Sequence, residues 1–223
     1  MSLSQLNRLP VSSFRLSTHS LSIMFSNSDP DTFDSATLPA IRFKAKINNE
    51  YSFLSNFYPD VKNFKEGVTP ALASPGRMFM WGMLQFDSVE QLYQHRKFEH
   101  IGDGDYAHLI FINREAQAVK KLSGKGFYVQ WKYERLASQG RKTTKASIKR
   151  DFEEKLKTFP RLAVMREALF LKFTQNPELK AALLATGDRR LEEQGRMKSE
   201  YWSHTGGNFL GRLLMELRSQ LRQ

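Results

Sequence analysis

The chain of 223 residues is 40% hydrophobic and 12% aromatic, which is enough to bury one sizeable core and predicts a single domain. It carries 34 Lys and Arg against 23 Asp and Glu, and the resulting net charge of +11 favours anionic partners such as phosphates, nucleotides or nucleic acid. The absence of cysteine excludes disulfides, thiolate nucleophiles and cysteine-bound zinc. No apolar run approaches the roughly 20 residues that span a bilayer, so we expect no membrane partner.

The first 40 residues differ in composition from the rest. Residues 1–40 are rich in serine and contain no acidic residue before Asp29. This composition predicts a disordered N-terminal extension, or a true start at Met24. Mitochondrial transit peptides share these features, so organellar targeting is an open alternative, but arginines are few and we expect a cytoplasmic protein. We place the folded domain at residues 41–223.

The first predicted strand covers residues 41–47, where apolar side chains alternate with Arg and Lys at period two. The hydrophobic run 78–86 predicts a second strand. From Asp87-Ser88 onward the patterns are helical. The expected fold class is therefore α+β, predominantly α-helical, in a single domain with a small β element built from residues near 41–47 and 77–86.

Three later stretches carry apolar residues at helical spacing and are predicted to be core. The residues are Leu162, Met165, Leu169 and Phe173 in the first, the group 179–184 in the second, and Leu210, Leu213, Leu214, Leu217 and Leu221 in the last. Helices that bury these stripes against one another would form most of the domain.

A basic segment lies between these patterns, within a predicted insertion near residues 125–150. Its cations, with Glu134 as the only acid among them, are Lys132, Arg135, Arg141, Lys142, Lys145, Lys149 and Arg150. A solvated loop and helix face explains such a run, and so does a contact with phosphate or nucleic acid. Both interpretations stay open.

The segment 89–98 offers several reactive side chains on one helical face, with Ser88 as the predicted N-cap. At 3.6 residues per turn, Glu90 and Lys97 return to the same face, and Tyr93 and Gln94 lie between them. A Glu and a Lys two turns apart more often mark an exposed face than a site, so this pattern alone leaves the function open.

A polar pair enclosed by aromatic residues stands earlier in the chain, at Phe53-Leu54-Ser55-Asn56-Phe57-Tyr58-Pro59. Asn56 offers a donor and an acceptor for a base edge or sugar hydroxyl, while Phe57 and Tyr58 could stack on a planar ring. The pattern indicates a binding loop. A buried, hydrogen-bonded Asn at the end of a core strand is the alternative.

A third motif runs from Tyr201 to Arg218, and within it Gly206-Gly207-Asn208 stands directly before a predicted helix. Flexible glycines and a capping Asn can aim backbone amides at an anion, and they also make a good helix start. The sequence does not choose between these two roles.

Together and in this order, these motifs resemble the NADAR family, also called the YbiA-like N-glycosidases. Family members carry a Ser-Asn-Phe loop and then a helix that starts with Glu and ends in Gln-x-x-Lys-Phe, as do Glu90, Gln94, Lys97 and Phe98. Further matches follow at residues 164–173, 183–186, 202, 206–211 and 214–218. The resemblance spans roughly residues 48–221.

The resemblance implies hydrolysis of the bond between ribose C1 and a nitrogen. Such families are assigned to the reactive ribosylamino-pyrimidine phosphates of riboflavin biosynthesis, a metabolite damage-control role, and some members remove ADP-ribose from guanine bases. Glu90 would then be the catalytic carboxylate, Lys97 a phosphate contact, and Asn56 and Asn208 groups that orient the ribose or base. The further substrate-binding candidates are Ser55, Phe57, Tyr58, Trp202 and Gly207.

The chain also departs from the family pattern. Where many members have an Asp three residues before the late Trp, this chain has Ser199, and the neighbouring Glu200 is the candidate for a second acid. The residue after that Trp is usually Gly and is Ser203 here. A Trp that members carry before the long helix aligns with Phe152, and Trp131 lies in the preceding insertion, so either aromatic is a candidate for stacking on the base.

We predict neither a metal nor a cofactor, because the histidines show no HExxH spacing and no phosphate-binding glycine loop follows a predicted strand. Three functions stay open. The preferred one is a metabolite N-glycosidase that acts on small phosphorylated, nucleotide-like substrates. The second is a hydrolase that removes ADP-ribose from bases in nucleic acid, which the basic segment favours. The third is a non-catalytic nucleic-acid-binding module, which Ser199 permits.

Overall fold

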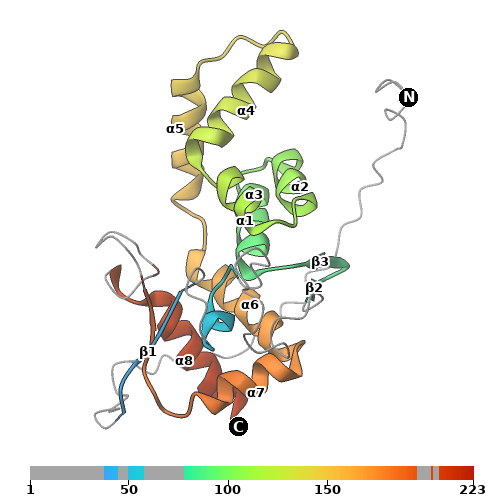
Figure 1. Cartoon of the computed structure of the whole chain (residues 1–223). Coiled ribbons are helices and arrows are strands. Elements are labelled where there is room, and N and C mark those ends of the chain that lie inside the picture. Colours follow the sequence, from blue (N-terminus) through green and yellow to red (C-terminus); the bar gives the residue numbers. More distant parts are fainter. Residues whose placement is uncertain (1–37, 45–49, 58–77, 195–201, 203–205) are drawn as a thin grey trace. The chain divides into compact units, whose positions relative to one another are not determined.

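Helices make up most of this chain, which a computed structural model describes over residues 38–44, 50–57, 78–194, 202 and 206–223 (Figure 1). The described residues belong to one compact unit, and the predominantly helical α+β class expected from the sequence is confirmed. Within these ranges no helix combines the length and apolar character needed to cross a membrane. The prediction of a disordered extension falls on residues outside the described ones, except for positions 38–40.

From α1 to α7 the helices follow one another along the chain with short connections. The helices are the single 3-10 turn η2 (Ser52–Leu54) and the α-helices α1 (Val89–His100), α2 (Gly104–Ile112), α3 (Ala116–Leu122), α4 (Lys125–Ser138), α5 (Lys145–Leu156), α6 (Arg161–Thr174), α7 (Pro177–Ala185) and α8 (Phe209–Leu221).

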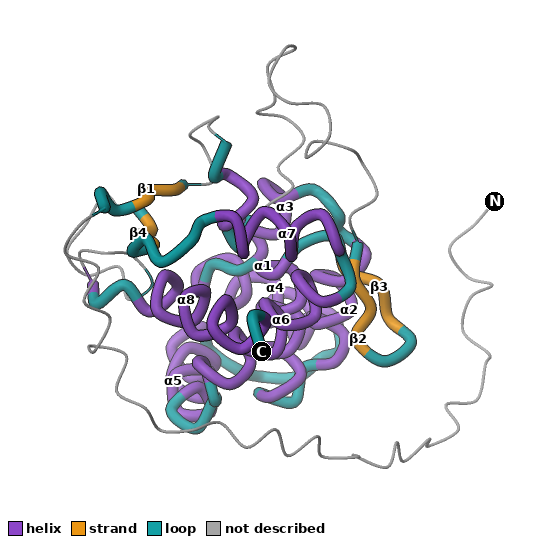
Figure 2. Tube along the Cα trace, turned by 90° about the horizontal axis from the view of Figure 1, so that it is seen from below, coloured by secondary structure: helices purple, strands orange, loops and turns teal. Residues whose placement is uncertain are grey.

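The strands form two separate two-stranded sheets, which lie on opposite sides of the helices (Figure 2). β1 (Ile41–Phe43) pairs in parallel with β4 (Leu191–Glu193). β2 (Phe79–Trp81) pairs antiparallel with β3 (Leu84–Phe86).

These strands differ in detail from the expected β element. The run 78–86, expected as one strand, is a hairpin, because Gly82 has a φ of 59° and occupies the first position of a two-residue turn. The strand expected over 41–47 ends at Phe43, and its partner lies about 150 positions further along the chain instead of in the hairpin. The expected single element is therefore two small sheets.

The larger hydrophobic core forms where α6 packs against α1, α7 and α8. The predicted stripes contribute to this core. Leu162 and Leu221, at the ends of two stripes, are partly buried. The buried residues of the stripes are Met165, Leu169, Phe173, Leu179, Leu183, Leu210, Leu213, Leu214 and Leu217. The core residues predicted from helical spacing are therefore confirmed, except that in the group 179–184 Ala181 is exposed and Leu184 is only half-buried.

A second apolar cluster holds α2, α3, α4 and α5 together, with Phe98, Tyr106, Tyr128 and Phe152 as its large aromatic members. α1 takes part in both clusters, because Leu92 is buried in the first and Phe98 in the second. Both cores therefore hold α1 in place.

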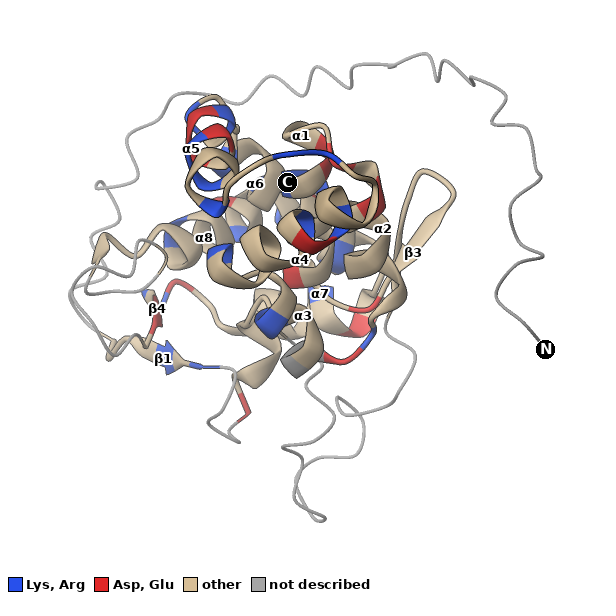
Figure 3. Ribbon diagram, turned by 90° about the horizontal axis from the view of Figure 1, so that it is seen from above, with Lys and Arg blue, Asp and Glu red and all other residues tan. Residues whose placement is uncertain are grey.

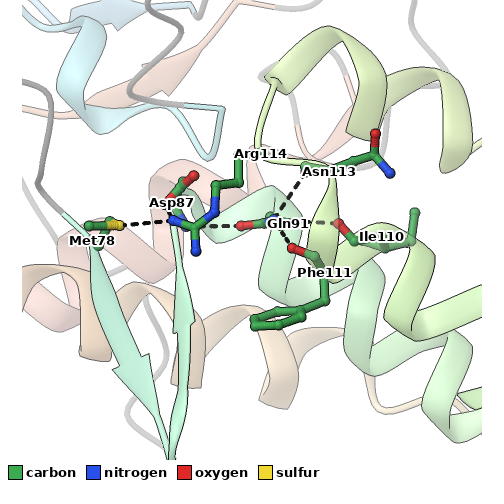
Figure 4. A network of polar contacts seen from close by, with 7 residues as sticks. All are labelled: Met78, Asp87, Gln91, Ile110, Phe111, Asn113 and Arg114. Atoms are coloured by element: carbon green, nitrogen blue, oxygen red, sulfur yellow. Dashed lines mark hydrogen bonds and ion pairs between the residues drawn. The ribbon is translucent and has the colours of Figure 1, made fainter. Parts of the chain in front are cut away.

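A glutamine fixes the start of α1 to the end of α2 (Figure 4). The Gln91 amide nitrogen donates to the carbonyls of Phe111 at 2.8 Å and Asn113 at 3.0 Å, while its oxygen accepts from the Asp87 N–H at 2.9 Å. Carbonyls at the end of a helix have no partner within the helix, so Gln91 satisfies groups that would otherwise be unbonded. The first turn of α1 is thus held against a neighbouring helix.

A buried carboxylate joins the predicted insertion to the rest of the domain. Asp103 caps α2 by accepting from the Tyr106 N–H, and it also accepts from the Tyr128 hydroxyl at 3.1 Å and the Lys132 ammonium at 2.7 Å. The predicted insertion near residues 125–150 corresponds to α4, the first half of α5 and the connection between them. Lys132 and Tyr128 therefore anchor it through α4.

Candidate functional site

Glu90 lies in the first turn of α1, one of the positions where a negative charge is favoured by the helix dipole. Ser88 caps this helix as predicted, since its hydroxyl accepts from the Gln91 N–H at 3.2 Å. The backbone N–H of Glu90 has no partner within the helix and donates to the Asn56 carbonyl at 2.8 Å. The Ser-Asn loop is thereby attached to the start of α1.

Two side-chain amides hold the Glu90 carboxylate. Asn56 Nδ2 donates to one oxygen and Gln94 Nε2 to the other, both at 2.6 Å. Glu90, Asn56 and Gln94 are only 7%, 4% and 7% exposed. The structure therefore brings together Asn56 and Glu90, two predicted site residues that are 34 positions apart in the sequence.

Burial dominates the electrostatics of this group. Removal from water raises the pKa of the Glu90 carboxyl, against the opposing effects of the Gln94 amide and the charges of Lys97 and Lys120. Burial also lowers the pKa of Lys97 to about 8, although the Glu90 charge opposes this. Lys97 Nζ donates to the Ser123 carbonyl at 3.1 Å. A carboxylate and an ammonium on one helical face are thus both destabilised in their charged forms.

A buried lysine on α6 supports the Ser-Asn loop. Lys172, 2% exposed, donates from Nζ to the carbonyls of Phe53 at 2.7 Å and Ser55 at 2.9 Å. Burial lowers the pKa of Lys172 to about 7. Because Ser55 precedes Asn56, Lys172 positions the backbone from which the Asn56 amide reaches Glu90.

The other predicted members of the loop have distinct positions. Ser55 is buried, and its hydroxyl accepts from the Phe57 N–H at 3.2 Å, which fixes the turn after Asn56. Phe57 is half-buried. Tyr58 lies outside the described residues. The substrate contacts expected of these three side chains stay predictions.

Trp202 connects the C-terminal motif with α1. Its ring meets that of Tyr93 edge to face, with centroids 5.7 Å apart and planes at 88°. Its carbonyl accepts from the Leu210 N–H of α8 at 3.3 Å. Tyr93 lies one turn from Glu90, so Trp202 packs beside the helix that carries the carboxylate.

Asn208 precedes α8 in a left-handed conformation, with a φ of 54°, and its side chain does not cap the helix. The capping expected of it is therefore wrong. Instead its amide donates to the Leu191 carbonyl at 2.8 Å and accepts from the Glu193 N–H at 3.2 Å, tying α8 to β4. Gly207, with a φ of 114°, lies against the Phe209 ring. The substrate contacts expected of Gly207 and Asn208 stay predictions.

A family model of the NADAR domain matches residues 42–222. The chain belongs to the NADAR family. The N-glycosidase YbiA of Shigella boydii is 50% identical over 62 residues, which are 26% of this chain and 38% of that protein. An N-glycosidase of Nostoc punctiforme is 30% identical over 139 residues, which are 60% of this chain and 74% of that protein.

The fold of this NADAR protein is similar to that of a solved structure. The NMR structure of YbiA from Escherichia coli matches with a TM-score of 0.52, covering 83% of this chain and 87% of its own at 24% identity. At this identity the match supports the fold alone.

The candidates for base stacking lie in the second core of the NADAR domain. Phe152 is buried there, with the rings of Tyr128 and Phe98 at 4.9 and 6.1 Å. Trp131 is half-buried beside Tyr106, and the Arg135 guanidinium lies over its ring. The structure gives both aromatics a packing role, and a base would have to displace a neighbour to stack on Phe152.

Two further candidates concern acids and metals. Glu200, the candidate for a second acid, lies outside the described residues. Within the described ranges, no cluster of three or more His, Asp or Glu side chains could hold a metal ion. The predictions about a second acid and a metal both stay open.

Sequence reasoning missed two residues of this site. Gln94 was placed on the Glu90 face but was not identified as a group that holds the carboxylate. Lys172 falls within the family match at residues 164–173, but no role of its own was predicted for it. A lysine directly beside the buried Phe173 and three residues from the buried Leu169 is unusual. That position on an apolar stripe was the available signal, since buried lysines require specific partners.

Proposed function

We propose that this NADAR protein is an N-glycosidase that hydrolyses the bond between ribose and a nitrogenous base in small phosphorylated compounds, namely the ribosylamino-pyrimidine phosphates of riboflavin biosynthesis. The observation that carries the proposal is the buried Glu90 carboxylate, held on both oxygens by Asn56 and Gln94. The names of the Shigella and Nostoc relatives, both N-glycosidases, support the same reaction class.

The chemistry asked of Glu90 follows from the bond. When the nitrogen leaves C1, the sugar acquires oxocarbenium character, and a nearby carboxylate can stabilise that charge or activate the incoming water. Both roles use the ionised form. The amides of Asn56 and Gln94 stabilise that form and hold the oxygens in position before the substrate arrives.

Lys97 is the proposed phosphate contact. An ammonium has three N–H donors, and the Ser123 carbonyl accepts from one of them. The remaining donors suit a phosphate, which offers only acceptors. The half-exposed Phe57 and the Trp202 ring beside Tyr93 are the proposed surfaces for the base.

The test is product release by wild type and Glu90→Gln, offered a ribosylamino-pyrimidine phosphate. We expect wild type to release ribose 5-phosphate and Glu90→Gln to be at least about a hundredfold slower. Glu99→Gln is the matched control. Glu99 lies on the same helix, but its carboxylate contacts His95 Nε2, at 3.4 Å, and not the residues that hold Glu90. Equal loss in both variants would point to general damage to α1.

A second candidate is removal of ADP-ribose from guanine in nucleic acid, which a basic surface favours. In the basic segment, Lys132 pairs with Asp103 and Arg135 with Asp105. Five other cations are exposed and form no ion pair with any described residue: Arg141, Lys142, Lys145, Lys149 and Arg150. Such a cluster suits a phosphate backbone.

The two candidates are separated by offering ADP-ribosylated guanine in parallel. Release of ADP-ribose by wild type and not by Glu90→Gln would favour the second candidate. Absence of release from either substrate would overturn the N-glycosidase proposal and favour a non-catalytic nucleic-acid-binding module.

A further inference from the structure

Two enclosed oxygen atoms beside Glu90 have no hydrogen-bond donor among the described residues. They are Asn56 Oδ1 and Gln94 Oε1. The orientation of both amides follows from the chemistry, because a carboxylate accepts hydrogen bonds and must face the nitrogen of each amide. The two oxygens are therefore acceptors. A buried acceptor without a donor is unfavourable, and such an atom in a native protein calls for a ligand or another donor.

We propose that these two oxygens accept hydrogen bonds from hydroxyl groups of the substrate's sugar, so that Asn56 and Gln94 make the site select ribosyl over 2-deoxyribosyl groups. The inference rests on the N-glycosidase function proposed above and deepens it. It adds Gln94 as a residue that determines specificity.

The location of the oxygens supports a sugar hydroxyl as the donor. Each oxygen shares its carbon atom with a nitrogen that donates to one of the two Glu90 carboxylate oxygens, so both acceptors lie close to the carboxylate. When Glu90 faces C1 of the sugar, substituents of the neighbouring ring atom lie next to these oxygens. In ribose that atom carries a hydroxyl, which donates one hydrogen bond to one of the two oxygens, while in 2-deoxyribose it carries only hydrogen and leaves that acceptor unsatisfied.

The acceptors also restrict what else can bind beside Glu90. A phosphate or a carbonyl brings further acceptors and no donor, so it is repelled from this position. Glu90, Asn56 and Gln94 are 7%, 4% and 7% exposed, while the two oxygens themselves are enclosed, so a hydroxyl reaches these oxygens only when the site opens around them.

The same oxygens favour the transition state. They are the negative ends of two amide dipoles, and a sugar that loses its nitrogen becomes positively charged near C1. Hydrogen bonds to the hydroxyl next to C1 strengthen as that charge develops. The selectivity should therefore appear in kcat as well as in KM.

The first test compares kcat/KM for a ribosylamino-pyrimidine phosphate and its 2-deoxyribosyl counterpart. We expect wild type to prefer the ribosyl compound about ten- to a hundredfold, and Gln94→Met to reduce that ratio towards one. Gln91→Met is the control, because Gln91 is buried on the same helix but bonds only to backbone groups near the end of α2 and the start of α1. It should keep the ratio even where it lowers stability.

Equal rates for the two sugars in wild type, or an unchanged ratio in Gln94→Met, would overturn the inference while leaving the N-glycosidase function intact. If neither compound is hydrolysed, the proposed function fails, and calorimetric titration with ribose 5-phosphate and 2-deoxyribose 5-phosphate decides the inference by itself. Tighter binding of ribose 5-phosphate that is lost in Gln94→Met supports it. Equal affinities, or binding of neither sugar phosphate, overturn it.

Discussion

At the scale of single residues, the candidate site contains an acid and a base, Glu90 and Lys97, whose pKa values are shifted in opposite directions by burial. Loss of water raises the pKa of Glu90 and lowers that of Lys97 to about 8. Each charge partly offsets the shift of the other. The charged pair therefore exists in a narrower pH window than two exposed groups would have.

This window predicts a bell-shaped dependence of kcat/KM on pH. Activity should rise as Glu90 ionises, at a pH above the ordinary value of 4.5, and fall as Lys97 loses its proton near pH 8. Lys97→Arg keeps a positive charge at all these pH values. It should therefore lose the alkaline limb and keep the acid one, and an alkaline limb that persists in this variant would assign it to another group.

Lys172 provides a second prediction at this scale. Lys172→Met leaves the carbonyls of Phe53 and Ser55 without their buried donor, which we expect to lower the free energy of unfolding by about 1–3 kcal/mol. It should also lower kcat, because the loop that carries Asn56 loses its support. Urea denaturation and steady-state kinetics measure the two effects. Lys149→Met on the exposed face of α5 is the control and should change stability by less than about 0.5 kcal/mol.

At the scale of elements, the junction of α8 with β4 depends on close backbone approach. Asn208 bonds to the backbone of β4 through both ends of its amide. Gly211, on the first turn of α8, leaves room for this contact, since a Cβ there would collide with the Leu191 carbonyl and the Asn208 side chain. The backbone of Gly211 is helical, so its conformation does not require glycine. The close packing against Leu191 and Asn208 does.

Gly211→Ala is therefore expected to destabilise the protein by about 1–3 kcal/mol or more through overpacking. Gly126→Ala in α4 is the matched control, because nothing lies within 4 Å of a Cβ built at that position. Alanine there should leave stability unchanged or raise it by up to about 1 kcal/mol. Thermal unfolding of both variants checks the pair, and equal effects would contradict the packing argument.

At the scale of the whole molecule, the net charge is +11, and the basic side chains differ in whether they pair with an acidic residue. α5 contains basic and acidic residues together, as the ribbon colours of Figure 3 show, and Lys155 pairs with Asp151 one turn away. Of the five exposed cations named above for the basic segment, Arg141 and Lys142 lie in the connection between α4 and α5, and the other three lie in the first half of α5. These cations form a local positive region that would attract an anionic polymer.

This distribution predicts how salt should act. If nucleic acid binds through the five cations, its affinity should fall on the order of 10²- to 10³-fold between 50 and 200 mM KCl. The rate with a small phosphorylated substrate should change much less. Lys142→Glu with Lys149→Glu should weaken only the nucleic-acid complex, and Lys180→Glu on α7 is the control. A salt-insensitive complex, or one unaffected by the double variant, would remove the basic segment from consideration.

Local sequence patterns determined the positions and the buried faces of several helices. The stripe from Leu210 to Leu221 predicted α8, because a helix forms contacts between residues three and four apart. Ser88 predicted the start of α1 for the same reason, since a cap bonds within its own turn. Helical spacing also placed Glu90 and Gln94 on one face.

Tertiary structure alone decided which distant segments meet. β1 pairs with β4, Lys172 supports the Ser-Asn loop, and Asn208 binds β4 instead of capping α8. A strand, a buried ammonium or an amide carries no local signal that names its partner, because such contacts join residues that only the packing of both cores brings together. For the same reason the Asn56 amide on Glu90, which completes the candidate site, becomes visible only in the folded chain.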